Sequence, residues 1–217
     1  MQIVIIGASG FIGSALTAEA LQRGHQVRAL VRDTSKLAAL QQQYPQQLQV
    51  VSVDVLDSRA LLPWLQQQPL VISAFSGHSD ADVSGYYQRG FASILQAVKQ
   101  SAVERFLLVG GAASLQLPDG SKLLDSPNFP AAYRGTAEGA YAALQQLRSE
   151  TGLVWSYLSP AAEIFPGDKT GQYRLGQDYL LADQDGRSRI STGDYAAAML
   201  NEAEQPQHQN KRFSIAY

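Results

Sequence analysis

Short apolar runs alternate along the chain with longer stretches in which apolar residues recur every three or four positions. Continuous β-branched and apolar runs are typical of buried parallel strands, whereas the longer period is typical of helices packed on a sheet. The runs lie at residues 3–6, 27–31, 48–53, 70–74, 105–109, 154–158 and 212–216, and the helical stretches at about 35–43, 60–67, 83–101, 131–150 and 192–204, with a further one that stops at Gly24. This alternation predicts an α/β fold, a doubly wound parallel sheet with helices on both faces.

The first apolar run leads into a glycine-rich turn, residues 7–13, with the sequence GASGFIG. Glycines at positions 7, 10 and 13 allow a sharp turn from strand to helix, a close approach of a ligand to the backbone, and tight packing of the helix on the sheet. A helix that starts there offers free N–H groups and a positive dipole end to a phosphate. The turn therefore predicts a Rossmann-like domain whose cofactor pyrophosphate lies on Gly7, Ser9, Gly10, Phe11, Ile12 and Gly13. The alternative is a glycine-rich turn without a ligand.

The ends of the next strands supply the remaining candidate cofactor contacts. Arg32 follows the second strand, where an arginine can accept the 2′-phosphate of NADP. This favours NADP(H), with NAD(H) still possible; the alternative is a solvated charge. Asp54, with Val55, follows the third strand near the expected adenine edge, although Asp54 is equally suited to cap the next helix. Ala74, Phe75 and Ser76 leave the fourth strand, where ligands of open parallel sheets bind.

Composition narrows the class of protein. The chain has 217 residues, a formal charge of −2, three histidines and no cysteine. These values exclude disulfides and thiolate metal sites, and they give no basic field for nucleic acid. The first residues form a core strand without the features of a signal peptide, and no apolar run reaches the ~18 residues of a membrane span. We therefore expect a cytoplasmic monomer or homodimer without a metal, folded as one domain over 1–217 with a small substrate lobe from about 160 to 217.

Later segments sharpen a resemblance that begins with the GASGFIG turn. They are GGAAS at 110–114, LSPAAE at 158–163, PG at 166–167, TGQYRLG at 170–176, RIS at 189–191 and DYA at 194–196. The chain resembles the atypical short-chain dehydrogenases of the NmrA-like, NAD(P)-binding branch, in particular small proteins described as NADH-flavin reductases. The resemblance implies that Ser114 polarises a substrate carbonyl, that Tyr133 occupies the place of the catalytic tyrosine, and that Pro160 lies near the nicotinamide carboxamide.

One departure from that family pattern affects the chemistry. The usual enzymes of this fold place Tyr-x-x-x-Lys on the helix that contains Tyr133, but the fourth residue after Tyr133 is Ala137, and no tyrosine of the chain has a lysine at that spacing. An ordinary alcohol dehydrogenase mechanism is therefore disfavoured, as is a sugar-nucleotide epimerase. A flat acceptor such as a flavin or quinone needs no strong general acid, because it takes hydride directly and solvent can supply the proton. The sequence thus predicts an NAD(P)H-dependent reductase of such a small-molecule acceptor.

A second hypothesis remains open. The missing Tyr-x-x-x-Lys pair is equally compatible with a non-catalytic NADP(H)-sensing regulatory protein of the NmrA-like type. In either case residues 115–130, with prolines at 118, 127 and 130, predict a binding loop or lid.

Overall fold

The computed structural model describes residues 1–78 and 80–217. Its centre is an eight-stranded sheet in the order β3-β2-β1-β4-β5-β6-β10-β8. Seven of these strands are parallel and β8 pairs antiparallel with β10. The strands are β1 (Gln2–Ile6), β2 (Gln26–Val31), β3 (Leu48–Ser52), β4 (Leu70–Ser73), β5 (Arg105–Val109), β6 (Trp155–Ser159), β8 (Arg174–Gly176) and β10 (Lys211–Ala216).

The strand order reverses between β1 and β4, and this reversal positions the site. From β1 the chain builds outward through β2 and β3, then returns to place β4 on the other side of β1. Ile5 pairs with Ala29 of β2 on one side and with Ile72 of β4 on the other. In doubly wound sheets the ligand crevice lies outside the carboxyl ends of the strands at this reversal. The predicted doubly wound, Rossmann-like fold is confirmed.

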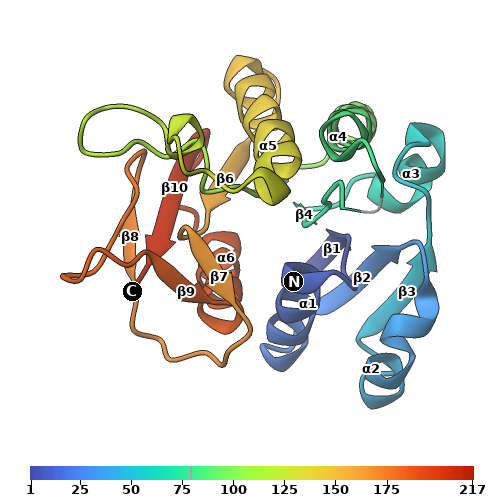
Figure 1. Cartoon of the computed structure of the whole chain (residues 1–217). Helices are drawn as coiled ribbons and strands as arrows, with labels where there is room; N and C mark the ends of the chain where they lie inside the picture. Colours follow the sequence, from blue (N-terminus) through green and yellow to red (C-terminus); the bar gives the residue numbers. More distant parts are fainter. Residues whose placement is uncertain (79) are drawn as a thin grey trace.

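Helices cover both faces of the sheet (Figure 1). One face carries α1 (Phe11–Gln22), α2 (Ala38–Gln43) and α6 (Thr192–Glu204); the other carries α3 (Ser58–Leu65), α4 (Val83–Gln100) and α5 (Ala131–Ser149). Ile3 and Ile5 belong to the buried core on the α1 and α6 side, whereas Val4 and Ile6 belong to the core on the opposite side. A strand that is apolar at every position is buried on both faces, which explains the unbroken apolar runs in the sequence.

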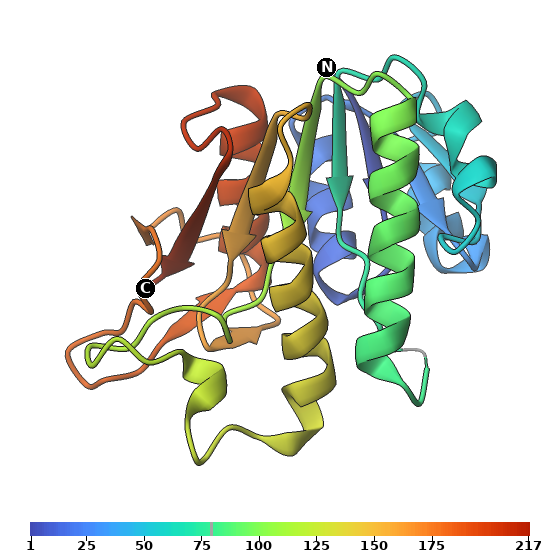
Figure 2. The ribbon, with the colours of Figure 1, turned by 90° about the horizontal axis from the view of Figure 1, so that it is seen from above.

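The C-terminal segment adds a second, two-stranded sheet of β7 (Glu163–Phe165) and β9 (Arg189–Ser191). This sheet and the loops around it lie beside the ends of the central strands (Figures 1 and 2). Residues 115–130, predicted as a binding loop or lid, contain some regular structure. The Leu117 N–H donates to the Ser121 carbonyl and closes a turn, and a short 3₁₀ helix η2 (Leu123–Asp125) follows. The turn is also bridged to Tyr179 through Gln116, so this segment is anchored to the C-terminal part of the chain.

Candidate functional site

The glycine-rich turn between β1 and α1 contains two glycines that the fold itself requires. Gly7 has a φ of +75°, and a β-carbon there would lie 2.8 Å from the carbonyl oxygen of Ala74. A β-carbon on Gly13 would lie 2.0 Å from the carbonyl oxygen of Gly7. Both positions are steric necessities of the strand-to-helix corner, whether or not a ligand is present.

Gly10 differs from these two glycines. Its φ of −77° and ψ of 178° suit any residue, it is exposed, and a β-carbon there would meet only the Gly7 carbonyl oxygen, at 3.3 Å. It is also the N-cap of α1 and offers no side-chain cap, so the first-turn N–H groups of α1 are left to an outside acceptor. This single contact is tight but much milder than those at Gly7 and Gly13, and a pyrophosphate lying on the turn would leave no room for a side chain here. The cradle therefore fits the predicted cofactor.

Three other residues of the turn were also predicted to contact the cofactor. Phe11 is 53% exposed on the first turn of α1, while Ile12 is half-buried against the core and Ser9 half-buried at the corner. These positions are compatible with contact through the backbone of the turn, and Phe11 adds an exposed ring beside it.

Arg32 and Asp33 follow β2 and have different surroundings. Asp33 is tied into local structure: its carboxylate accepts from the Ser35 hydroxyl (2.6 Å) and from the Ser35 N–H (3.0 Å), which caps the 3₁₀ helix η1 (Thr34–Leu37). These two bonds, the hydroxyl first, lower the pKa of Asp33. Arg32 is exposed, and none of the carboxylates in the described ranges forms an ion pair with it. The guanidinium at this strand end is thus available to a ligand.

The structure changes the interpretation of Asp54 and Val55. The helix that follows, α3, is capped by Asp57, which accepts from the N–H groups of Arg59 and Ala60. The alternative that Asp54 caps this helix is therefore wrong. The Asp54 carboxylate instead accepts from the Leu56 N–H at 2.9 Å and remains exposed. Val55 is 6% exposed in the core, so only its backbone is placed to meet a cofactor.

The segment after β4 lines the same edge of the sheet. Ala74 is half-buried, Ser76 is exposed, and the half-buried ring of Phe75 packs 5.7 Å from the ring of Tyr87 on α4. On β6, which β5 separates from β4 in the sheet, Pro160 follows the last strand residue and is buried. The ends of β1, β4 and β6 thus bring these predicted contacts to one edge of the sheet.

Ser114 is buried and hydrogen-bonded to Arg212. It is 5% exposed, and Arg212 of β10 donates both to its hydroxyl (2.9 Å) and to its carbonyl oxygen (3.0 Å). Arg212 in turn is paired with Asp178, with a distance of 2.8 Å from Nε to the carboxylate. This network ties the segment after β5 to β10 and to the segment after β8. The geometry therefore favours a structural role for Ser114 over the predicted catalytic one.

Tyr133 lies on the first turn of α5 and is 62% exposed. Its predicted catalytic role rests on position alone. Deeper along α5, where a lysine would follow, the inward positions are Ala137 and Ala140. The Tyr157 hydroxyl of β6 fills this region: it donates to the Ala140 carbonyl (3.1 Å) and accepts from the Gly111 N–H (2.9 Å). Sequence reasoning missed Tyr157, because its pattern is that of an ordinary buried strand residue.

Asp194, also missed, organises the C-terminal segment. It is buried at the start of α6, and its carboxylate accepts from the Thr170 N–H and hydroxyl, the Gly171 N–H and the Tyr217 hydroxyl, all within 2.9 Å. Burial alone would raise its pKa, but these bonds outweigh burial and lower it. On the same segment, Lys169 donates to Glu19 of α1 at 2.8 Å. The C-terminal segment is thereby fixed beside the helix that begins at the glycine-rich turn.

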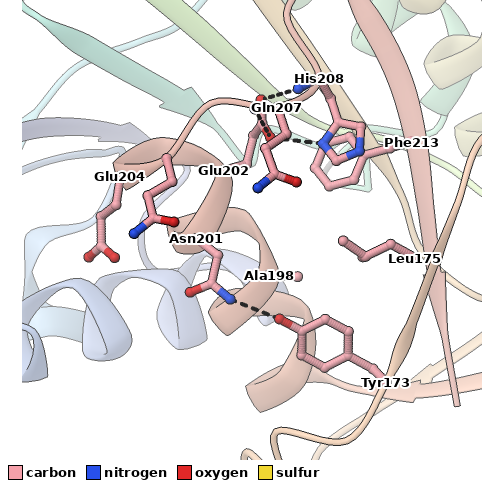
Figure 3. Close-up of a pocket in the computed structure, with 10 residues that line it drawn as sticks. Tyr173, Leu175, Ala198, Asn201, Glu202, Glu204, Gln207, His208 and Phe213 are labelled. Carbon is pink, nitrogen blue, oxygen red and sulfur yellow. Dashed lines mark hydrogen bonds and ion pairs between the residues drawn. The ribbon is translucent and has the colours of Figure 1, made fainter.

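A cavity of about 340 Å³ lies at a different place in the fold (Figure 3). Its walls come from the end of α6, the loop that leads into β10, and β8, and they include Asn201, Glu202, His208 and Phe213. Glu202 is 4% exposed and its carboxylate accepts from His208 Nδ1 at 2.8 Å. Because β10 begins here and runs parallel to β6, this cavity lies towards the opposite edge of the sheet from the glycine-rich turn.

Fold and site together define a dinucleotide-binding protein, and comparisons with known proteins agree. A family model described as NAD(P)H-binding matches residues 7–206. The chain belongs to this NAD(P)H-binding family. An uncharacterized protein of Bacillus subtilis (strain 168), YwnB, is 36% identical over 218 residues, covering 99% of this chain and 98% of that protein.

Two solved structures extend the comparison. A protein of Bacteroides thetaiotaomicron, provisionally named an epimerase, superimposes with a TM-score of 0.91 at 39% identity. The superposition covers 100% of this chain and 96% of the Bacteroides chain. A Streptococcus pneumoniae protein with the provisional name of NADH-flavin reductase gives a TM-score of 0.84 at 31% identity, covering 100% and 99%. The resemblance seen in the sequence is confirmed, and a nicotinamide cofactor and an oxidoreductase class are supported.

In residues 1–78 and 80–217, none of the helices combines the length and the apolar character that a membrane span requires. Within the same ranges, no three His, Cys, Asp or Glu side chains are grouped so that they could hold a metal ion.

Proposed function

We propose that this protein is an NADPH-dependent reductase of a flat, readily reduced acceptor such as a flavin or quinone. The observation that supports this most is the combination of a complete glycine cradle with no Tyr-x-x-x-Lys pair. A β-carbon on Gly10 would meet one backbone oxygen at 3.3 Å, a much milder contact than those at Gly7 and Gly13, and α1 begins without a side-chain cap. At the same time Ala137 and Ala140 occupy the inward face of α5.

In this proposal the chain's own residues bind and orient. The backbone of residues 7–13 holds the pyrophosphate, Arg32 pairs with the 2′-phosphate of NADP, and Asp54 lies at the adenine edge. The segment Ala74–Ser76 and Pro160 lie beside the nicotinamide end. When bound, the nicotinamide supplies the hydride, and the protein supplies its orientation relative to the acceptor. An arginine rather than an acidic residue at position 32 favours NADP(H) over NAD(H), because Asp33 is already engaged by Ser35.

The name of the Streptococcus pneumoniae relative supports a flavin as acceptor. A flavin or quinone presents a flat ring that stacks on a nicotinamide, and it needs no strong protein acid once the two rings are held in contact. The absence of a need for a protein acid agrees with the composition of the site. The described strand ends present mainly backbone groups and few ionisable side chains to a ligand. The epimerase name of the other relative gains no support from this site, because the chain lacks the Tyr-x-x-x-Lys pair of such enzymes.

The test is to mix purified protein with NADPH and either FMN or a naphthoquinone, and to follow the nicotinamide absorbance under anaerobic conditions. Turnover that depends on the protein and exceeds the spontaneous reaction supports the proposal. Tight NADPH binding without turnover of either acceptor favours the regulatory NADP(H) sensor instead. The Gly10→Val variant is the matched control, since it blocks the cradle and leaves the rest of the edge intact.

A further inference from the structure

Three tyrosines of the described chain are 3% exposed or less, and the hydroxyls of two of them already form hydrogen bonds. Tyr157 bonds Gly111 and Ala140, and Tyr195 of α6 donates to the Leu158 carbonyl at 2.7 Å. The third, Tyr87, lies on the first turns of α4 and is 3% exposed. Within the described ranges nothing forms a hydrogen bond with its hydroxyl. The Tyr87 oxygen is not one of the sealed polar atoms of the core that lack a partner, so it can be reached from outside and can donate a hydrogen bond to a bound molecule.

The chain makes room for the Tyr87 side chain from two directions. A β-carbon on Gly139 of α5 would lie 2.7 Å from the Tyr87 β-carbon, and one on Gly77 would lie 3.1 Å from it. The ring also packs against Phe75, with 5.7 Å between ring centroids. Tyr87 therefore lies directly against the segment that leaves β4, the segment we assign to the nicotinamide end of the cofactor site.

In the usual enzymes of this fold, the catalytic tyrosine lies on the helix that corresponds to α5. The contacts of Tyr87 place a tyrosine ring beside that helix. In this chain α5 contributes Gly139 and Ala140 there, and the ring comes from α4 instead. We propose that the Tyr87 hydroxyl donates a hydrogen bond to the ring carbonyl of the acceptor, the group that gains negative charge on reduction. The inference rests on the proposed reductase function and assigns to that site a specific donor.

The role of Tyr87 as a hydrogen-bond donor follows from the protonation state of its hydroxyl. Burial, with a smaller contribution from Tyr157, raises the pKa of Tyr87 far above its ordinary value. The hydroxyl therefore keeps its proton at any working pH, and Tyr87 acts as a hydrogen-bond donor rather than as an acid or base. A preorganised donor at developing charge stabilises the transition state in the manner of an oxyanion hole. The proton that completes the reduced acceptor comes from solvent.

The test compares Tyr87→Phe with Tyr86→Phe. Tyr86 is the neighbouring buried tyrosine, and its ring also packs 5.7 Å from Phe75, so the pair differs in which hydroxyl is removed. We expect Tyr87→Phe to lower kcat about 100-fold with FMN and with a naphthoquinone. Its KM for NADPH and its melting temperature should remain those of Tyr86→Phe, because the ring is retained.

A second readout does not depend on turnover. Oxidised FMN is titrated into protein saturated with NADP⁺, in which no hydride is available, and binding is followed by flavin fluorescence. Loss of one hydrogen bond should weaken FMN binding about three- to tenfold in Tyr87→Phe and not in Tyr86→Phe. Equal kcat and equal FMN affinity in the two variants would overturn the inference while leaving the reductase function intact. A wild-type protein that binds NADPH but reduces neither acceptor would overturn both.

Discussion

Gly13 faces Gly7 so closely that a β-carbon on Gly13 would lie 2.0 Å from the carbonyl oxygen of Gly7. This contact brings α1 onto the end of β1, and no side-chain adjustment can relieve a clash between a β-carbon and backbone. Gly10, three residues earlier, has no comparable contact. Substitution of Gly13 therefore tests the requirements of folding, and substitution of Gly10 tests those of cofactor binding.

The first prediction uses that difference. Gly13→Ala should lower the free energy of unfolding by about 1–3 kcal/mol or more, because the helix must move off the sheet. Gly10→Val should leave most of the stability intact and abolish NADPH binding, since its side chain occupies the place of the pyrophosphate. Thermal unfolding and fluorescence titration with NADPH measure the two effects. Full NADPH affinity in Gly10→Val would mean that the turn is not the phosphate site.

The second prediction concerns the choice of cofactor. Arg32→Ala should weaken NADPH binding about tenfold or more and spare NADH, because only NADPH has the 2′-phosphate that a guanidinium can bind in a bidentate manner. Lys36→Ala is the matched control: it removes one positive charge from the same exposed segment. Isothermal titration with both nucleotides gives the answer, and an equal loss for NADPH and NADH would contradict the NADP assignment.

The strands and helices were largely predictable because each has a local signal. The limits of β5 and α6 coincide with the predicted 105–109 and 192–204. Where two local signals compete, the sequence does not decide between them. Asp54 and Asp57 are both suitable helix caps, and only the backbone geometry after β3 selects Asp57. The three-residue strands β7 and β9 are too short to show a period.

The candidate site was predictable only where the backbone forms it. The glycine cradle and the strand ends follow from chain order and the topology of the sheet. The contacts of Ser114 with Arg212 join residues 98 positions apart, and no local pattern encodes such a pairing. Tyr87 is another example, since its position on a helical apolar face gives no sign of the glycines on α5 and after β4 that surround it.

The third prediction tests Ser114. Ser114→Ala removes the hydroxyl that Arg212 contacts, so we expect a loss of about 1–3 kcal/mol in the free energy of unfolding and little change in kcat. A group that polarised the substrate would instead cost about 100-fold in kcat. Ser76→Ala is a useful comparison, because Ser76 is exposed at the cofactor edge and its loss should leave the unfolding temperature unchanged. A large fall in kcat with unchanged stability would restore the catalytic assignment of Ser114.

The fourth prediction is a pH dependence that originates at Asp194. The hydrogen bonds from Gly171, Thr170 and Tyr217 overcome the effect of burial and hold the pKa of this carboxyl below the ordinary 3.8. A carboxyl whose pKa is lower in the folded state stabilises the fold above its unfolded pKa, and the stabilisation is lost as the pH falls through the folded pKa. Asp194→Asn should therefore lower the free energy of unfolding by about 1–3 kcal/mol at pH 7, because it leaves buried donors without an acceptor.

The difference between wild type and Asp194→Asn should narrow only at a pH below the ordinary carboxyl range, as the wild-type carboxylate becomes protonated. Denaturant unfolding at a series of pH values from neutral to strongly acidic measures this change. Asp185→Asn is the control, because Asp185 is an exposed turn residue paired only with Arg187 among its described neighbours, and it should give a small, nearly pH-independent difference. If the gap between wild type and Asp194→Asn stayed constant down to the acid limit of the folded state, the bonds that fix residues 170–171 and Tyr217 would not depend on the charge of Asp194.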